Sequence, residues 1–265
     1  AEYILMEYLP GIRLERPQHG KKTMFLLKII DIQLELKKLT FSKIGSIFFD
    51  GKNGFEIGQV IENNFFNGEQ VTLSTVEWGP FNTTQEYILN IIRNQIHYYK
   101  SKDTQKCWIP KYEKLCKLVP KYFQDDGNDT YVLTHGDFHL SNILVKNDEI
   151  TGIIDWECSS AFPIEFLCTY LIWISENPVS KNNLLLKKFF CNELSCRDSN
   201  FIRIIDNINE GKKEFYSAVF SQGVWKVDLP HKNIEKRRIL IITKQVFWSL
   251  YHPNEHLGKE QYHID

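Results

Sequence analysis

The stretch from Tyr131 to Glu157, YVLTHGDFHLSNILVKNDEITGIIDWE, decides how this chain is organised. Runs rich in Val, Leu and Ile lie on both sides of a polar loop, and the turn residues Asn147-Asp148-Glu149 divide the later part. Short apolar runs bounded by turn residues are typical of β-strands. We therefore predict a strand, a loop, and then a hairpin made of two further strands.

The loop and the end of the hairpin carry side chains that suit phosphoryl transfer. Asp137 supplies a carboxylate, and Asn142 follows it five residues later on the same loop. The hairpin turn brings Asp155 back alongside them. Phosphoryl transfer needs a carboxylate to orient the attacking hydroxyl and Mg²⁺ held by one or two hard oxygen ligands from the protein. We predict Asp137 as the catalytic base and Asn142 and Asp155 as Mg²⁺ ligands.

Four neighbouring residues have supporting roles in this interpretation. His135 precedes the base by two residues and is expected to hold the loop by hydrogen bonds rather than to transfer a proton. Leu144 and Ile154 are apolar positions on the two hairpin strands, predicted to form the floor under a purine ring. His139 is predicted to be a solvent-facing loop histidine, with contact to the acceptor substrate as the alternative.

Length and composition exclude several classes of protein. The chain has 265 residues, of which 43% are apolar, enough for a real core in one large or two small domains. A net charge of −1 leaves no basic footprint for nucleic acid. The sequence contains no run of eighteen apolar residues, so we predict no membrane span. The cysteines form no C-x-x-C pair, so we expect a cytoplasmic chain with free thiols. Two alternatives are less favoured: a mitochondrial location, and a disulfide bridge between Cys191 and Cys196.

The chain before the central stretch begins with an apolar, β-rich run, Glu2 to Leu9, which Pro10-Gly11 ends. This run reads as a buried strand, and nothing precedes it to accept its hydrogen bonds, so we expect the sequence to begin inside a fold. Apolar residues at helical spacing then predict a helix over 21–39. Turn residues predict a hairpin with strands at 43–50 and 55–62. Two further helices are predicted, one over 84–100 capped by Asn82 or Thr83 and one over 110–123.

The chain after the central stretch is predicted to be helical. Pro163 begins an apolar helix over 164–174, and further helices are expected over 181–193, 200–225 and 234–250, followed by a polar tail. The predicted fold class is α+β and mostly helical, and we find no domain boundary after residue 15.

The central stretch carries a resemblance to a known family. His135-Gly-Asp-Phe-His-Leu-Ser-Asn-Ile-Leu144, with Gly152-Ile-Ile-Asp-Trp-Glu157, resembles the aminoglycoside phosphotransferase and choline kinase-like family. A His-x-Asp-x₄-Asn motif followed by a hairpin that ends in Asp is similar to the protein-kinase catalytic arrangement. Ile4 to Gly11 is similar to that family's hinge between lobes, and Gly79-Pro80-Phe81 is similar to its fungal branch. The resemblance extends from residue 3 to at least residue 165.

The resemblance implies a protein-kinase-like fold, ATP and Mg²⁺ as cofactors, and transfer of the γ-phosphoryl group to a hydroxyl of a small molecule. It gives Asp137 the role of base and Asn142 and Asp155 the role of metal ligands. The backbone of Glu7, Tyr8 and Leu9 would bind adenine, with Met6 near the ring. Glu157 lies where the acceptor approaches in relatives, and with Glu165 it would suit a cationic, amine-bearing alcohol.

Two departures from the family pattern shape the remaining expectations. Pro163 is followed by Ile164-Glu165-Phe166, where relatives usually carry Asp-Leu. No glycine-rich loop and no suitable Lys precede the hinge. We therefore expect residues 1–12 to be the last strand of the N-terminal lobe and the hinge, and residues 13–265 to be a C-terminal lobe with a helical substrate pocket, the N-terminal lobe being largely absent. The alternative function is a non-catalytic scaffold that binds a nucleotide or a partner. An exposed apolar strand at residues 3–9 would favour self-association.

Overall fold

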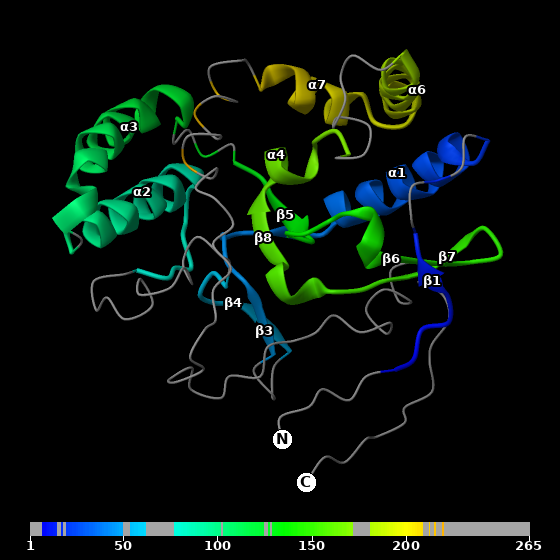
Figure 1. Cartoon of the computed structure of the whole chain (residues 1–265), viewed down its shortest axis with the longest axis horizontal. Helices are drawn as coiled ribbons and strands as arrows, with labels where there is room; N and C mark the ends of the chain where they lie inside the picture. Colours follow the sequence, from blue (N-terminus) through cyan, green and yellow to red (C-terminus); the bar gives the residue numbers. More distant parts are fainter. Residues whose placement is uncertain are drawn as a thin grey trace, which may run out of the picture.

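The computed structural model describes residues 7–14, 17, 20–49, 54–61, 77–101, 103–124, 127, 129–171 and 181–208, with residues 212, 215 and 219. Within these ranges, helices combine with three small antiparallel sheets, which confirms the predicted α+β class (Figure 1). The helices are α1 (Lys22–Lys38), α2 (Thr84–Lys100), α3 (Ile109–Tyr122), α4 (Ile164–Leu167), α6 (Lys181–Arg197) and α7 (Ser199–Asn207). The predicted helix over 234–250, the tail and residues 1–6 lie outside the described residues.

The predicted central stretch supplies strands to two of the sheets. β5 (Tyr131–Thr134) lies between β2 (Thr40–Phe41) and β8 (Ser160–Pro163), and all three pair antiparallel. β6 (Ile143–Lys146) and β7 (Glu149–Ile153) form the predicted hairpin, and β1 (Ile12–Arg13) pairs with the outer side of β6. The third sheet is the predicted hairpin of β3 (Ile47–Phe49) and β4 (Phe55–Ile57). The expected order of strand, loop and hairpin in residues 131–157 is therefore confirmed.

The β6–β7 hairpin is held to α1 at its turn. Lys21, just before α1, donates to both carboxylate oxygens of Asp148 at 2.6 and 2.7 Å. Lys28, about two turns further along the chain, pairs with Glu149. These ion pairs are exposed, so each contributes little to stability, but together they set the position of the turn.

Helix α1 carries the core that supports β5 and the hairpin. Its apolar residues recur at helical spacing and bury one face, whose members are Phe25, Leu26, Ile29, Ile30, Ile32 and Leu36. The N-terminal part of this face packs with Ile143 of β6 and with α6 and α7. Ile32 and Leu36 pack with Val132, Leu133 and Ile153. The strands that bracket the polar loop are thus fixed to one helix.

A second core joins α2 and α3 to the other end of β5. Thr83 caps α2, its Oγ1 accepting the Glu86 N–H at 3.1 Å, which confirms the predicted helix and selects Thr83 over Asn82 as the cap. Asp129 accepts the Thr84 N–H at 3.0 Å, so the residues before β5 are also bound to the start of α2. Tyr131 belongs to this second core, in which Tyr87, Ile88 and Ile91 of α2 are buried.

Strand β8 was not expected, because it begins with Ser160, directly after a second serine. Ser160 is fully buried, and its hydroxyl lies 2.7 Å from that of Ser46, so the polar side chain is satisfied inside the sheet. β1 was also not expected.

The prediction of a buried strand is wrong for the described part of its range. Residues 7–10 form no strand, and Tyr8 is 83% exposed.

The helices after residue 163 differ in length from the prediction. α4 begins at Ile164 as expected but ends at Leu167, whose carbonyl accepts a hydrogen bond from buried Gln33 of α1 at 3.3 Å. α6 continues to Arg197, and α7 ends at Asn207 instead of continuing to residue 225 without a break. All six cysteines are free, so Cys191 and Cys196 are not bridged. None of the described helices combines the length and apolar character needed to cross a membrane.

Asp198 is predicted to stabilise the fold through two separable interactions. Its carboxylate accepts the Phe201 N–H at 3.1 Å as the cap of α7, and it pairs with Lys37 of α1. Burial raises the pKa of Asp198. Lys37 and the backbone N–H groups of Asn200 and Phe201 lower it by more than burial raises it, so the pKa lies below 3.8. Because the folded-state pKa is lowered, this stabilisation is present above pH 3.8 and is lost as the pH falls through the lowered pKa.

The substitution Asp198→Asn keeps a good cap and removes only the charge, whereas Asp198→Ala removes both. We expect Asp198→Ala to be less stable than Asp198→Asn by about 1 kcal/mol at pH 7 in urea unfolding. The difference between wild type and Asp198→Asn should shrink as the pH falls below 3.8. Equal stability of the two variants at pH 7 would contradict the capping role.

Candidate active site

The polar loop after β5 begins with a turn that only glycine can make. Gly136 has a φ of +78°, and a methyl group added there would lie 2.2 Å from the carbonyl oxygen of Cys158. The 3₁₀ turn Trp156–Cys158 therefore lies directly against the start of the loop. This packing brings the segment after Asp155 beside Asp137, although the two are separated by the whole hairpin.

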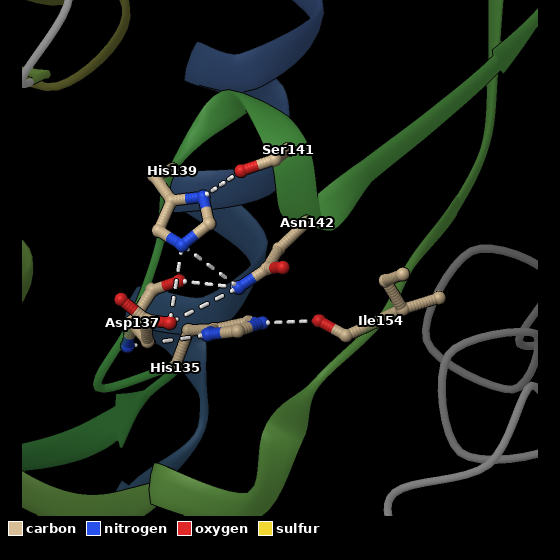
Figure 2. A network of polar contacts seen from close by, with 6 residues as sticks. All are labelled: His135, Asp137, His139, Ser141, Asn142 and Ile154. Atoms are coloured by element: carbon tan, nitrogen blue, oxygen red, sulfur yellow. Dashed lines mark hydrogen bonds and ion pairs between the residues drawn. The ribbon is translucent and has the colours of Figure 1, made fainter. Parts of the chain in front are cut away.

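His135 joins the loop to the end of β7. Its ring is 2% exposed, with Nε2 2.9 Å from the Ile154 carbonyl oxygen and Nδ1 3.3 Å from the Asp137 N–H (Figure 2). A carbonyl only accepts, so Nε2 carries the proton and Nδ1 accepts from Asp137. Burial lowers the pKa of His135 below its usual value, which favours this neutral form. The ring also packs against Trp156 in a tilted arrangement, with 4.5 Å between the centroids.

Asn142 makes the second connection between loop and hairpin. It is buried at the end of the 3₁₀ turn Leu140–Asn142, and its Nδ2 donates to the Asp137 carbonyl at 3.0 Å and, more weakly, to Oδ2 of Asp137 at 3.3 Å. Its backbone carbonyl accepts the Ile154 N–H at 2.9 Å. With Nδ2 bound in this way, the amide oxygen of Asn142 points away from Asp137 (Figure 2).

Asp155 follows Ile154 in a left-handed backbone conformation, with φ of +68° and ψ of +53°. Such a conformation is unfavourable for residues other than glycine, although Asp tolerates it better than most. Both polar backbone groups of Ile154 are bound to the loop, so the start of Asp155 is fixed relative to Asp137 and Asn142. Strained backbone of this kind is concentrated at functional sites.

The sequence predicted that His139 faces solvent, but in the structure both of its ring nitrogens also contact side chains of the loop. Its Nε2 lies 3.1 Å from Oδ2 of Asp137, and its Nδ1 lies 2.6 Å from the Ser141 hydroxyl (Figure 2). The His139 side chain is 37% exposed and that of Asp137 is 50% exposed. Sequence reasoning did not single out Ser141. The available signal was its spacing, because Asp137, His139 and Ser141 occupy every second position of the loop sequence.

The residues expected at the hinge lie along the hairpin. Leu9 packs against Gly152, where an added methyl group would lie 2.5 Å from Leu9 Cδ1, and Thr151 donates its hydroxyl to the Pro10 carbonyl at 2.6 Å. β1 then pairs Arg13 with Leu144. The structure thus brings Leu9 to the sheet of β6 and β7. Leu144 lies on β6 and Ile154 follows the end of β7, and both residues are half-buried. The side chains of Glu7 and Tyr8 are exposed, and Met6 lies outside the described residues.

The two acidic residues expected near an acceptor lie in different surroundings. Glu157 is exposed on the turn that packs against Gly136. Glu165 is partly buried on α4 and accepts a hydrogen bond from Lys212 at 2.5 Å. Its charge is compensated within the chain, so Glu165 is a structural residue that ties α4 to Lys212, and Glu157 is the better candidate for contact with an acceptor.

The residues at this site fit Mg²⁺ better than a transition metal. Among the described residues, no group of three or more His, Cys, Asp and Glu side chains is placed to hold a metal ion. The Asn142 amide oxygen and the Asp155 carboxylate are two hard oxygen donors on adjoining segments. Mg²⁺ usually takes one or two protein ligands and completes its shell with water and substrate phosphates.

Comparison with protein-family models finds a match that covers more than half of the chain. The model of a phosphotransferase enzyme family, APH, matches residues 1–166, a range that contains every residue placed at the site above. Searches of curated proteins and of solved structures found no significant match.

Gly136→Ala should distort the loop and destabilise the protein. Its positive φ costs a residue with a Cβ about 1–2 kcal/mol, and the contact with Cys158 adds to this cost. Gly127 is a matched control, because it has a φ of +73° but nothing within 4 Å of an added methyl group. We expect Gly136→Ala to lower the free energy of unfolding by clearly more than Gly127→Ala, as measured by urea titration. Equal effects of the two substitutions would contradict the close packing of the loop on Cys158.

Proposed function

As the chain belongs to the phosphotransferase enzyme family, we propose that it transfers the γ-phosphoryl group of ATP to a hydroxyl group of a small molecule. The observation that supports this proposal is the pair of hydrogen bonds at Ile154. They hold the loop with Asp137 and Asn142 against the strand end that carries Asp155. The segments that carry the three side chains proposed for the acceptor and metal side of the reaction are thereby held together.

In the proposed reaction, Asp137 binds the acceptor hydroxyl and orients its oxygen towards the γ-phosphorus. The new oxygen–phosphorus bond forms as the bond between the γ-phosphorus and the bridging oxygen of ADP breaks. The hydroxyl proton moves to the Asp137 carboxylate. Half exposure of the Asp137 side chain allows an acceptor to reach it. Positioning of this kind is the main task of the protein in phosphoryl transfer.

Asn142 and Asp155 would hold Mg²⁺ in this proposal. Since Nδ2 of Asn142 already donates to Asp137, its amide oxygen is the atom left for a cation. Bound Mg²⁺ would neutralise charge on the phosphate oxygens. The buried, neutral His135 keeps the two metal-binding segments together without adding a positive charge beside the cation.

The nucleotide would lie between the hinge and the hairpin. We propose that the backbone of Glu7, Tyr8 and Leu9, with Met6, contacts adenine, and that Leu144 and Ile154 form the apolar floor. The packing of Leu9 on Gly152 and the bond between Thr151 and Pro10 support this arrangement, because they bring the hinge to the hairpin.

We propose an acceptor with a cationic amine beside its hydroxyl. Glu157 is exposed on the turn that packs against Gly136, next to the base. A carboxylate in that place would attract an ammonium group and bring the hydroxyl of the same molecule towards Asp137.

Asp137→Asn should lower turnover by roughly 10²- to 10⁴-fold, the usual contribution of a catalytic base. Turnover is measured as ADP formed from Mg²⁺-ATP with choline, an aminoglycoside and glucose as acceptors. Asp148→Asn is the matched control, because it lies at the opposite end of the same hairpin and its positive φ of 63° suits Asn. Unchanged turnover in Asp137→Asn would exclude the proposed base. Absence of Mg²⁺-ATP binding to the wild type in calorimetry would favour a non-catalytic scaffold instead.

Asp155→Asn should raise the Mg²⁺ concentration needed for half-maximal turnover by at least about 10-fold, because a carboxylate ligand is lost. Asn tolerates the left-handed backbone of this position, so the fold should be retained. The measurement is a Mg²⁺ titration of turnover at fixed ATP, with the far-ultraviolet circular dichroism spectrum as a check of folding. An unchanged Mg²⁺ requirement would show that Asp155 is not a ligand.

A further inference from the structure

The loop that carries the proposed base contains a chain of three polar side chains that the reaction scheme above does not use fully. Ser141 lies 2.6 Å from Nδ1 of His139, and Nε2 of His139 lies 3.1 Å from Oδ2 of Asp137 (Figure 2). All three residues belong to the segment from His135 to Asn142. The chain therefore ends on the carboxylate that would bind the acceptor.

The partners of His139 determine where its proton lies. An ionised carboxylate can only accept, so the hydrogen bond to Asp137 requires a proton on Nε2. In the neutral ring, Nδ1 is then an acceptor, and the Ser141 hydroxyl is the donor that it faces. Nδ2 of Asn142 lies 3.4 Å from Nε2 of His139, and both groups are donors, so both aim at the same oxygen of Asp137.

The two oxygens of Asp137 are consequently not equivalent. Oδ2 accepts from His139 at 3.1 Å and from Asn142 at 3.3 Å. Among the described residues, no hydrogen bond to Oδ1 is formed. An incoming hydroxyl therefore finds one oxygen occupied and the other open.

We propose that His139, held in its Nε2–H form by Ser141, is a positioning residue that binds Oδ2 of Asp137 and leaves Oδ1 as the oxygen that receives the acceptor hydroxyl. This proposal rests on the proposed phosphotransferase function. A carboxylate on a half-exposed loop can rotate about its Cβ–Cγ bond, and two donors on one oxygen hold it in one orientation. Orientation before the reaction lowers the barrier, and misplacement by about 1 Å can cost roughly 10²-fold in rate.

A purely structural role for His139 is less consistent with the geometry. Its side chain is 37% exposed, so it fills no core, and both of its ring nitrogens contact side chains within the loop rather than backbone of the surrounding fold. Holding the loop to the hairpin is the task of His135 and Asn142. Removal of the His139 ring should therefore change kcat more than stability.

The kinetic test compares His139→Leu, His139→Gln and Ser141→Ala with wild type, using Mg²⁺-ATP and the acceptor of the panel that gives the highest turnover. We expect His139→Leu to lower kcat roughly 10- to 100-fold with little change in the KM for ATP. Gln can place its own Nε2–H near the same oxygen, so His139→Gln should recover most of kcat. Ser141→Ala should have a smaller effect of the same kind. His97→Leu, an exposed histidine on α2, is the control expected to leave kcat unchanged.

A spectroscopic test does not depend on turnover. Long-range ¹H–¹⁵N correlation spectra of the histidine rings at pH 8 report which nitrogen carries the proton, and the signal of His139 is the one lost in His139→Gln. We expect a protonated Nε2 and a bare Nδ1 in wild type. Ser141→Ala and Asp137→Ala should each move the ring towards the tautomer mixture of free histidine.

The outcomes separate this inference from the proposed function. If wild type turns over and Asp137→Ala does not, while His139→Leu matches wild type in kcat, the positioning role is overturned and the proposed function stands. If wild type and Asp137→Ala are equally inactive, the proposed function fails, and the spectra decide on the hydrogen bonds of His139. A ring that carries its proton on Nδ1, or one that Ser141→Ala and Asp137→Ala leave unchanged, overturns the inference in either case.

Discussion

The site depends on the peptide groups of one residue, Ile154. Its N–H donates to the Asn142 carbonyl, and its C=O accepts from buried His135, so a strand end is bound to the loop on both sides. Without these two bonds, Asp155 would be connected to the loop of Asp137 and Asn142 only through the hairpin and through the packing of Gly136 on Cys158. Other contacts support this connection: α1 packs against β5 and β7, and Trp156 packs against the ring of His135.

Local signals in the sequence were enough to predict most elements around this joint. The turn at Asn147 and the cap of α2 each involve neighbours within a few residues. The turn was predicted correctly, and the sequence narrowed the cap to Asn82 or Thr83, of which the structure selects Thr83. A glycine between His135 and Asp137 likewise indicated a tight turn, because only a residue without a side chain fits there.

Contacts between distant residues could not be predicted in this way. Ser160 reads as a loop residue until Ser46, far away in the sequence, satisfies its hydroxyl inside the sheet. The apolar run after Pro163 predicts a longer helix, but Gln33 binds the Leu167 carbonyl where α4 ends. Glu165 reads as an acid available to a ligand until Lys212 compensates its charge. The contact of His139 with Asp137 is local, but it depends on loop conformation that spacing alone does not determine.

The two ends of the β6–β7 hairpin are held by different kinds of force, and ionic strength should act on them unequally. At the turn, Lys21–Asp148 and Lys28–Glu149 are exposed ion pairs, which dissolved salt screens. At the other end, a neutral imidazole and backbone amides make the connection, and screening hardly affects such bonds. Raising the salt concentration should therefore loosen the tip of the hairpin while the joint at Ile154 stays closed. The same hairpin can thus be mobile where it meets solvent and rigid where it meets the site.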